Sequence, residues 1–242
     1  MWSIGIMNYL VYQDWPNTSG NHAGIKYLCD YLAREYPLEY QSIPMPPDIV
    51  YNIYLPSIFG RIELNWKRFY FPIRNARRIR SIIKMIIKKI KDDDKVFLME
   101  YMIKRIEQNV IAESLKKYKQ EIPVYAMAHL TPPLTEMEFD LESFNKWLKP
   151  VDILLTLGNS LTTYYIKKGF NKKKIYTTFH YVDDYYLNND LIIHKTFTII
   201  VMGNMFRDME LLQKVVESNP DVHFKIRLLA GREEELHYLS LN

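Results

Sequence analysis

The chain has 242 residues, of which 48% are hydrophobic and 25% are charged, with a formal net charge of +4 and one cysteine. This is the composition of a globular protein, long enough for one large domain or two small ones. A lone cysteine excludes an internal disulfide, and the mild charge gives no signature of nucleic-acid binding. The amino terminus lacks the basic flank and cleavage site of a signal peptide, and no apolar run approaches the roughly 20 residues of a membrane span. The sequence therefore predicts a soluble, cytoplasmic protein.

The first expected element is a strand over residues 2–12, followed by a polar loop over 13–22. Ser19, Gly20 and Gly24 lie where this strand passes into a helix. Backbone N–H groups of a glycine-bearing loop before a helix can bind a phosphate or a sugar hydroxyl. These glycines do not form the full dinucleotide pattern, so an ordinary turn between a strand and a helix is an equal alternative.

A short strand is expected over 38–43, and the clearest amphipathic helix over 74–91. At 100° per residue, six isoleucines fall on one face of this helix: Ile79, Ile82, Ile83, Ile86, Ile87 and Ile90. The rest carries Arg77, Arg78, Arg80, Lys84, Lys88, Lys89 and Lys91, with no acidic residue among them. We expect the isoleucines to pack on the sheet. The basic face is either solvated or lies against anionic lipid, where each cation contributes about 1 kcal/mol.

Two groups of acidic residues flank the next expected strand, 95–99. Asp92-Asp93-Asp94 has the D-x-D spacing of the metal site in GT-A glycosyltransferases. These residues precede the strand, so they lie at the edge opposite a ligand site, and we predict a solvated loop and no metal site. Glu100 follows the strand, at the edge where such sheets bind their ligands, and is a candidate for contact with a ligand.

A helix over 104–119 and a strand over 122–128 come next, and His129 ends that strand. A histidine at the carboxyl end of a parallel strand lies where such folds bind their ligands. The alternative is a histidine that is satisfied by loop carbonyls. The prolines of the following segment, 130–133, predict an extended turn.

The stretch from 151 to 208 alternates short apolar runs with helical patterns. A run over 151–157 precedes a helix that stops at Gly169, a second run covers 174–179, and a third covers 196–202. A helix over 208–218 and a strand over 222–228 follow. This alternation predicts parallel strands joined by right-handed crossovers, with functional groups at the strand ends.

The order of five short motifs in this stretch resembles the domain junction of GT-B glycosyltransferases, and family 4 most of all. The motifs are Val151-Asp152-Ile153, Asn159-Ser160, Lys168-Gly169, Lys174-Ile175 and His180-Tyr181-Val182-Asp183, with Tyr181 where that family has glycine. Gly203 and Arg207 resemble the opening loop of its nucleotide-sugar-binding domain. The resemblance implies an α/β fold: a Rossmann-like parallel sheet with flanking helices over 1–190, then an incomplete second Rossmann-like domain over 196–242.

The resemblance also implies a function: transfer of a sugar from a nucleotide-sugar to a glycan or lipid-linked acceptor, in polysaccharide biosynthesis. The reaction would retain anomeric configuration and would use no metal and no cofactor besides the donor. The implied roles are catalysis for His129, acceptor binding for Ser19, Gly20, Glu100 and Ser160, and donor binding for Gly203, Asn204 and Arg207. The basic helix 74–91 would attach the protein peripherally to the inner face of a membrane.

Residues 196–242 are too few for a complete nucleotide-binding half, so impaired activity is expected. Glu113 and Glu121 show the eight-residue spacing of the family's donor-binding glutamates, but they lie in the first half of the chain, so we reject that match. The alternative from another class is a non-catalytic fragment or binding module that retains only the acceptor domain. A hydrolase is disfavoured because no G-x-S-x-G motif is present and Cys29 lies within a helical pattern.

Overall fold

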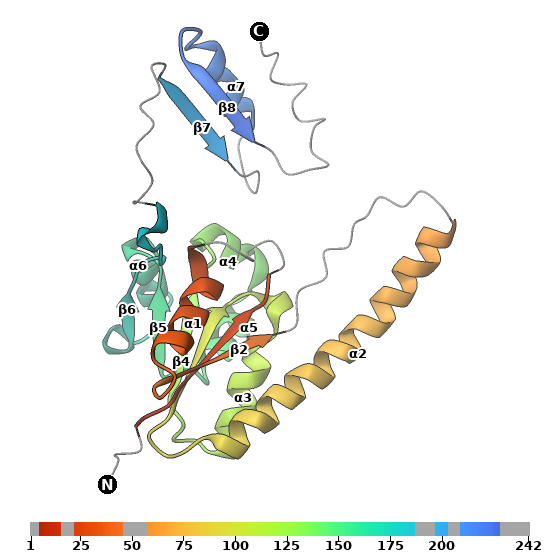
Figure 1. Ribbon diagram of the computed structural model, residues 1–242, viewed down its shortest axis with the longest axis vertical. Helices are drawn as coiled ribbons and strands as arrows, with labels where there is room; N and C mark the ends of the chain where they lie inside the picture. The colour runs from red at the N-terminus through yellow and green to blue at the C-terminus, as the bar shows by residue number, and fades with distance from the viewer. Residues whose placement is uncertain (1–4, 16–21, 46–57, 187–196, 203–208, 228–242) are drawn as a thin grey trace. The chain divides into compact units, whose positions relative to one another are not determined.

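The structure is a computed structural model that describes residues 5–15, 22–45, 58–186, 197–202 and 209–227 (Figure 1). The chain divides into two compact units, residues 1–188 and residues 189–242. We call them unit 1 and unit 2, and each is described by itself.

Unit 1 is built on a six-stranded sheet in the order β2-β1-β3-β4-β5-β6, in which every neighbouring pair is parallel. The strands are β1 (Asn8–Gln13), β2 (Tyr40–Met45), β3 (Lys95–Tyr101), β4 (Val124–Ala128), β5 (Ile153–Thr156) and β6 (Ile175–Thr177). The strand order reverses between β1 and β3, since β1 pairs with β2 on one side and with β3 on the other. In open parallel sheets, ligands bind outside the carboxyl ends of the strands at such a reversal.

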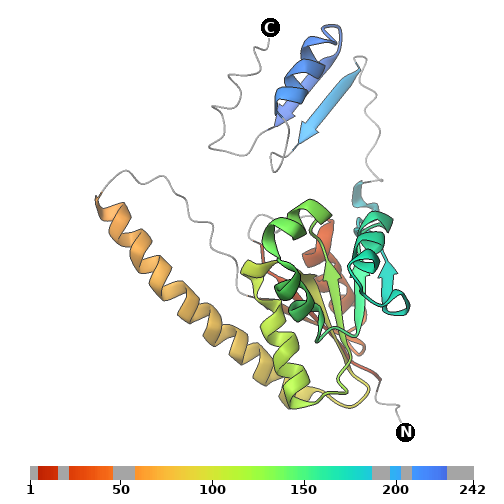
Figure 2. The ribbon, with the colours of Figure 1, turned by 180° about the vertical axis from the view of Figure 1, so that it is seen from behind.

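Helices cover both faces of this sheet. They are α1 (Gly24–Glu35), α2 (Ile58–Lys89), α3 (Gln108–Tyr118), α4 (Pro132–Glu138), α5 (Leu141–Leu148) and α6 (Asn159–Lys167), with short 3-10 turns at Lys104–Ile106, Lys172–Lys174 and Asp184–Tyr186. One core cluster joins α1 to the sheet through Ile25 and Cys29, and a larger one joins α2, α3, α5 and α6 to the other face. Figure 2 shows α3 and α5 in front of the sheet with α1 behind it. Right-handed crossovers that run in opposite directions along the sheet place their helices on opposite faces of the sheet, so both faces are covered.

Helix α2 confirms the predicted isoleucine stripe but is longer than the sequence indicated. Ile79, Ile83 and Ile86 are buried in the larger core, and the other stripe isoleucines pack against it. The helix begins at Ile58, not at residue 74, and ends at Lys89. Across the described residues, no helix combines the length and the apolar character needed to cross a bilayer.

Two local predictions at the ends of β3 and β4 were wrong. Asp94 is 3% exposed, and its carboxylate accepts hydrogen bonds from Met7 N (2.8 Å) and Lys91 N (2.9 Å), so it fastens the start of β3 instead of being solvated. After β4, Thr131 is extended, but α4 begins directly after it, at Pro132. Proline suits the first positions of a helix, because the N–H group that it lacks has no partner there.

Unit 2 contains a strand, a helix and a parallel strand, as the sequence predicted. They are β7 (Thr198–Met202), α7 (Met209–Glu217) and β8 (His223–Arg227). The two strands pair in parallel from Thr198 opposite His223 to Met202 opposite Arg227. This is one crossover of the kind that recurs throughout unit 1.

Candidate functional site at the carboxyl edge of the sheet

Glu100 links the ends of two central strands at the carboxyl edge. Its side chain is 7% exposed, and its carboxylate accepts hydrogen bonds from Gln13 N (2.6 Å) and from Trp15 Nε1 (2.5 Å). The Glu100 N–H donates to Gln108 Oε1 at 3.1 Å, and Gln108 Nε2 donates to Val11 O at 3.2 Å. Both carboxylate oxygens thus hold the end of β1 against the end of β3. A contact between Glu100 and an acceptor stays a prediction.

His129 follows β4 at the same edge, and its ring has one nitrogen engaged. Nε2 lies 2.9 Å from Met99 O. A carbonyl oxygen can only accept a hydrogen bond, so Nε2 carries the hydrogen, and in the neutral ring Nδ1 is an acceptor. Burial lowers the pKa of His129 to about 4, helped by the nearby His180, while the hydrogen bond to Met99 acts in the opposite direction. His129 is therefore a neutral imidazole at pH 7.

His180 belongs to the segment that follows β6 and lies beside His129. The two ring centroids are 5.6 Å apart, with an angle of 68° between the planes. In the sequence, His129 and His180 each directly follow an expected strand, and no pattern indicated that the two rings would meet. Their proximity contributes to the lowered pKa of His129.

A carboxylate on this segment fastens it to the start of α1. Asp183 Oδ2 accepts hydrogen bonds from Tyr27 Oη (2.5 Å) and His22 Nδ1 (3.0 Å), and Oδ1 accepts one from Tyr185 N (2.8 Å). Burial alone would raise the pKa of the Asp183 carboxyl, but the hydrogen bonds from Tyr27, His22 and Tyr185 together lower it below its usual value. Asp183 is therefore ionised near neutral pH and can hold all three donors.

Backbone contacts reinforce the same connection. Gly24 N donates to Tyr181 O at 3.0 Å, and Asp183 N donates to His22 O at 3.1 Å. Gly24 has a φ of +85°, in the region that favours glycine, so this residue can turn into α1 while its N–H meets the segment. The His22 ring stacks on the Tyr185 ring, with 3.9 Å between the ring centroids. The sequence showed Asp183 only as the end of a motif and gave no sign of these partners.

The other predicted site residues fall into two groups. Ser160 is exposed in the first turn of α6, directly after β5, so it lies at the same edge as Glu100 and His129. The remaining five lie outside the described residues: Ser19, Gly20, Gly203, Asn204 and Arg207. Among the residues that the structure describes, no three His, Cys, Asp or Glu side chains come together in a way that could hold a metal ion.

No protein-family model and no curated protein sequence matches the chain. Solved structures do match. Staphylococcus aureus MnaA, determined with UDP, is 12% identical with a TM-score of 0.55, over 98% of this chain and 66% of its own. The lipopolysaccharide outer core galactosyltransferase WaaB is 11% identical with a TM-score of 0.53, and the match covers 96% of this chain and 64% of WaaB. The UDP-N-acetylglucosamine 2-epimerase of Rickettsia bellii is 15% identical with a TM-score of 0.51, and the match covers 98% of this chain and 65% of the epimerase.

The chain therefore spans 64 to 66% of the length of these three proteins. Identities this low establish the fold alone. The similarity covers 96–98% of the chain, which contains the six-stranded parallel sheet of unit 1 and the strand–helix–strand of unit 2. The chain has the GT-B fold of UDP-sugar glycosyltransferases and epimerases, with a Rossmann-like first unit and an incomplete second one.

Proposed function

We propose that this chain is glycosyltransferase-like and transfers a sugar from a nucleotide-sugar donor to a glycan or lipid-linked acceptor. The observation that carries the proposal is the similarity over 96–98% of the chain to GT-B structures, among them one determined with UDP and one galactosyltransferase. UDP is accordingly the first nucleotide to test. Polysaccharide biosynthesis is the proposed setting.

His129 is the proposed acceptor-binding and catalytic group. With Nε2–H bonded to Met99 O, the unprotonated Nδ1 can accept a hydrogen bond from an acceptor hydroxyl and orient it. The proposed transfer retains anomeric configuration and uses no metal. Arg207 and the backbone amides around Gly203 and Asn204 would then stabilise the charge that develops on the leaving diphosphate, since a guanidinium can bond two phosphate oxygens at once.

We further propose that the 242-residue chain alone transfers sugar slowly. Holding a donor in a reactive geometry can contribute about 7–11 kcal/mol to catalysis, whereas one charge-assisted hydrogen bond contributes about 1.5–3 kcal/mol. This chain spans 64–66% of the length of the GT-B proteins that it matches, and the proposal assumes that part of their donor contacts lies outside the matched length. The alternative function is a binding module that holds an acceptor without catalysing transfer.

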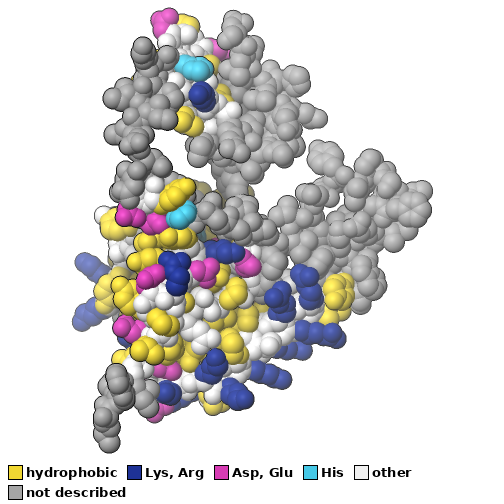
Figure 3. Space-filling view, in the orientation of Figure 1, with side chains coloured by type: hydrophobic (Ala, Val, Ile, Leu, Met, Phe, Trp, Pro, Cys, Tyr) yellow, Lys and Arg dark blue, Asp and Glu magenta, His cyan; other side chains and the backbone are white. Residues whose placement is uncertain are grey.

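The proposed setting for the reaction is the cytoplasmic face of an anionic membrane. All seven basic residues predicted on α2 and just after it are exposed, while the isoleucine stripe is packed in the core. Figure 3 shows these cations as a row of dark blue side chains along α2. Because the isoleucines pack in the protein core, they cannot insert into the membrane. Attachment would therefore be electrostatic and would weaken as the salt concentration rises.

The test is to measure UDP binding by calorimetry and then to incubate the chain with UDP-sugars and acceptor glycans, with mass spectrometry and NMR of the products. Transfer gives a heavier glycan, 2-epimerisation gives a sugar isomer of the same mass, and a binding module gives neither. His129→Asn should abolish any transfer, whereas the control His223→Asn, at the amino end of β8, should not. A chain that binds neither UDP nor a UDP-sugar at millimolar concentration would refute the proposal. Turnover at ordinary enzyme rates would refute the proposal that transfer is slow but would support the proposal that the chain transfers sugar.

A further inference from the structure

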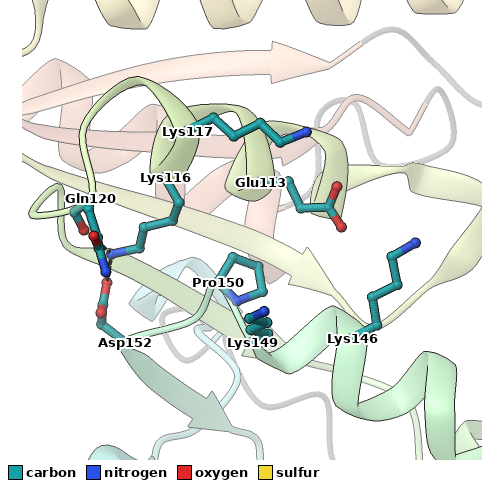
Figure 4. A pocket seen from close by; sticks show the side chains of 8 residues that line it. All are labelled: Glu113, Lys116, Lys117, Gln120, Lys146, Lys149, Pro150 and Asp152. Carbon is teal, nitrogen blue, oxygen red and sulfur yellow. Dashed lines mark hydrogen bonds and ion pairs between the residues drawn. The ribbon is translucent and has the colours of Figure 1, made fainter.

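A cavity of about 570 Å³ lies at the opposite edge of the sheet, between the ends of α3 and α5 (Figure 4). Asp152, which lines it, directly precedes β5 and accepts a hydrogen bond from Val124 N at the start of β4. The cavity is thus at the amino edge of strands whose carboxyl edge carries His129. It is separate from the site described above, and an inference about it does not rest on the proposed function.

One of the four lysines that line the cavity has a structural task. Lys116 Nζ lies 2.5 Å from Asp152 Oδ2, and it also donates to Gln120 O (3.0 Å) and Ile122 O (2.7 Å). An ammonium group has three hydrogens, and all three are used here. Lys116 and Asp152 therefore form a neutral pair that fixes the wall of the cavity.

The other three lysines, Lys117, Lys146 and Lys149, are exposed. In the part of the chain that the structure describes, none of their ammonium groups lies within 4.0 Å of a carboxylate. Figure 4 shows Lys117 and Glu113 extending from α3, with Lys146 and Lys149 across the cavity from them. Glu113 is the one remaining acidic group of the lining, so three positive charges face one negative charge.

This excess of charge is more than the helix ends explain. Lys117 and Lys146 lie in the last turns of their helices, and Lys149 directly follows α5. A cation in a last turn is stabilised by the helix dipole, which accounts for a lysine at each end. It does not account for three unpaired cations from two helices around one cavity, where they repel each other. An anion in the cavity would remove that repulsion.

We propose that this cavity binds a ligand bearing a phosphate or pyrophosphate group, with Lys117, Lys146 and Lys149 as its cationic contacts. Each ammonium group is a compact charge with three donors and can approach a different phosphate oxygen. The volume falls in the range of about 300–1,000 Å³ that is usual for small-molecule sites, so it admits a group attached to the phosphate. Glu113 can accept a hydrogen bond from a hydroxyl of that group. The ligand is either a soluble phosphorylated compound or the phosphorylated headgroup of a lipid.

Equilibrium dialysis of the full chain with radiolabelled inorganic pyrophosphate, at constant ionic strength, tests the site. The variant Lys117→Gln/Lys146→Gln/Lys149→Gln should weaken saturable binding at least ten-fold. The matched control Lys172→Gln/Lys173→Gln/Lys174→Gln removes the same charge from three exposed lysines of one 3-10 turn, and it should change binding less than two-fold. Circular dichroism of both variants verifies that the fold is kept.

A second arm separates the two sources of phosphate. Vesicles of phosphatidylcholine with phosphatidic acid are co-sedimented with the cavity variant and with Lys84→Gln/Lys88→Gln/Lys89→Gln on α2. If the cavity variant loses vesicle binding more than the α2 variant, the ligand is a lipid headgroup. If only the α2 variant loses it while pyrophosphate binding still depends on the cavity, the ligand is soluble. Equal losses of pyrophosphate binding in the cavity variant and its control, or no saturable binding by the native chain, would overturn the proposal.

Discussion

Replacing Glu100 by Gln tests whether this buried carboxylate holds the ends of β1 and β3 together. The substitution keeps the size of the side chain but leaves a single carbonyl oxygen to accept hydrogen bonds. Gln13 N and Trp15 Nε1 both donate to the carboxylate, at 2.6 Å and 2.5 Å. In the variant, one of these donors meets the oxygen and the other meets an NH₂ group, which cannot accept.

The expected loss follows from these two contacts. A hydrogen bond to a charged group contributes about 1.5–3 kcal/mol, and a neutral one about 0.5–1.5 kcal/mol. Two charged bonds are thus exchanged for one neutral bond, so we expect Glu100→Gln to lower the free energy of unfolding of unit 1 by about 1.5–5.5 kcal/mol.

Urea unfolding followed by tryptophan fluorescence measures this loss. All 4 tryptophans, Trp2, Trp15, Trp66 and Trp147, lie in unit 1, so the signal reports that unit alone. Trp15→Phe removes the indole donor together with part of the ring, and a double-mutant cycle with Glu100→Gln, which cancels the loss of packing, should give a coupling energy of about 1–2 kcal/mol. Glu121→Gln, at an exposed position, is the matched control and should stay within about 0.5 kcal/mol of the native chain. A Glu100→Gln variant as stable as the control, with no coupling to Trp15, would refute the structural role and leave the carboxylate available for a ligand.

Three further predictions concern His129, α2 and its basic face. The pKa of His129 is about 4 in the folded chain and about 6.5 in the unfolded chain, so the unfolded state binds more protons between these pH values. Acidification from pH 7 to pH 4.5 should therefore lower the free energy of unfolding of the native chain by up to about 3 kcal/mol more than that of His129→Asn. Urea unfolding that gives parallel pH profiles for the two chains would contradict this. Ile86 is fully buried, so Ile86→Ala should lower the free energy of unfolding by about 2–5 kcal/mol, and a loss below about 1 kcal/mol would show that α2 is not packed on the core. The chain should co-sediment with phosphatidylglycerol vesicles at low salt and be released as salt rises, and equal binding to neutral phosphatidylcholine vesicles would exclude electrostatic attachment through residues 74–91.

Most of the sheet could be predicted because parallel strands buried on both faces are short apolar runs. The strand expected over 122–128 is found at Val124–Ala128, and the run over 174–179 contains β6. The first half of α2 could not be predicted, because the aromatic cluster around Trp66 and the proline at 72 obscure the helical period.

For the candidate site, the sequence predicted which edge of the sheet carries it but not which side chains meet there. Strand order places Glu100 and His129 at the carboxyl ends of β3 and β4, and that rule needs only local patterns. Which atoms meet there depends on contacts between distant residues: Trp15 and Glu100 are 85 positions apart, and His22 and Asp183 are 161 apart. Asp94 shows the same limit, because its partner Met7 is 87 positions away. Periodicity within a short window carries no information about such pairs.

These contacts decide which group at the carboxyl edge is chemically available. Glu100 has both carboxylate oxygens engaged, by Gln13 at the end of β1 and by Trp15 two residues later. Asp183 has both of its oxygens engaged by His22, Tyr27 and Tyr185. Two buried or partly buried carboxylates thus hold together segments that are distant in the sequence. His129 differs, because its bond to Met99 O uses Nε2 and leaves Nδ1 as an acceptor. Burial keeps that nitrogen unprotonated at neutral pH, so the acceptor hydroxyl proposed here would meet a neutral base and not a cation.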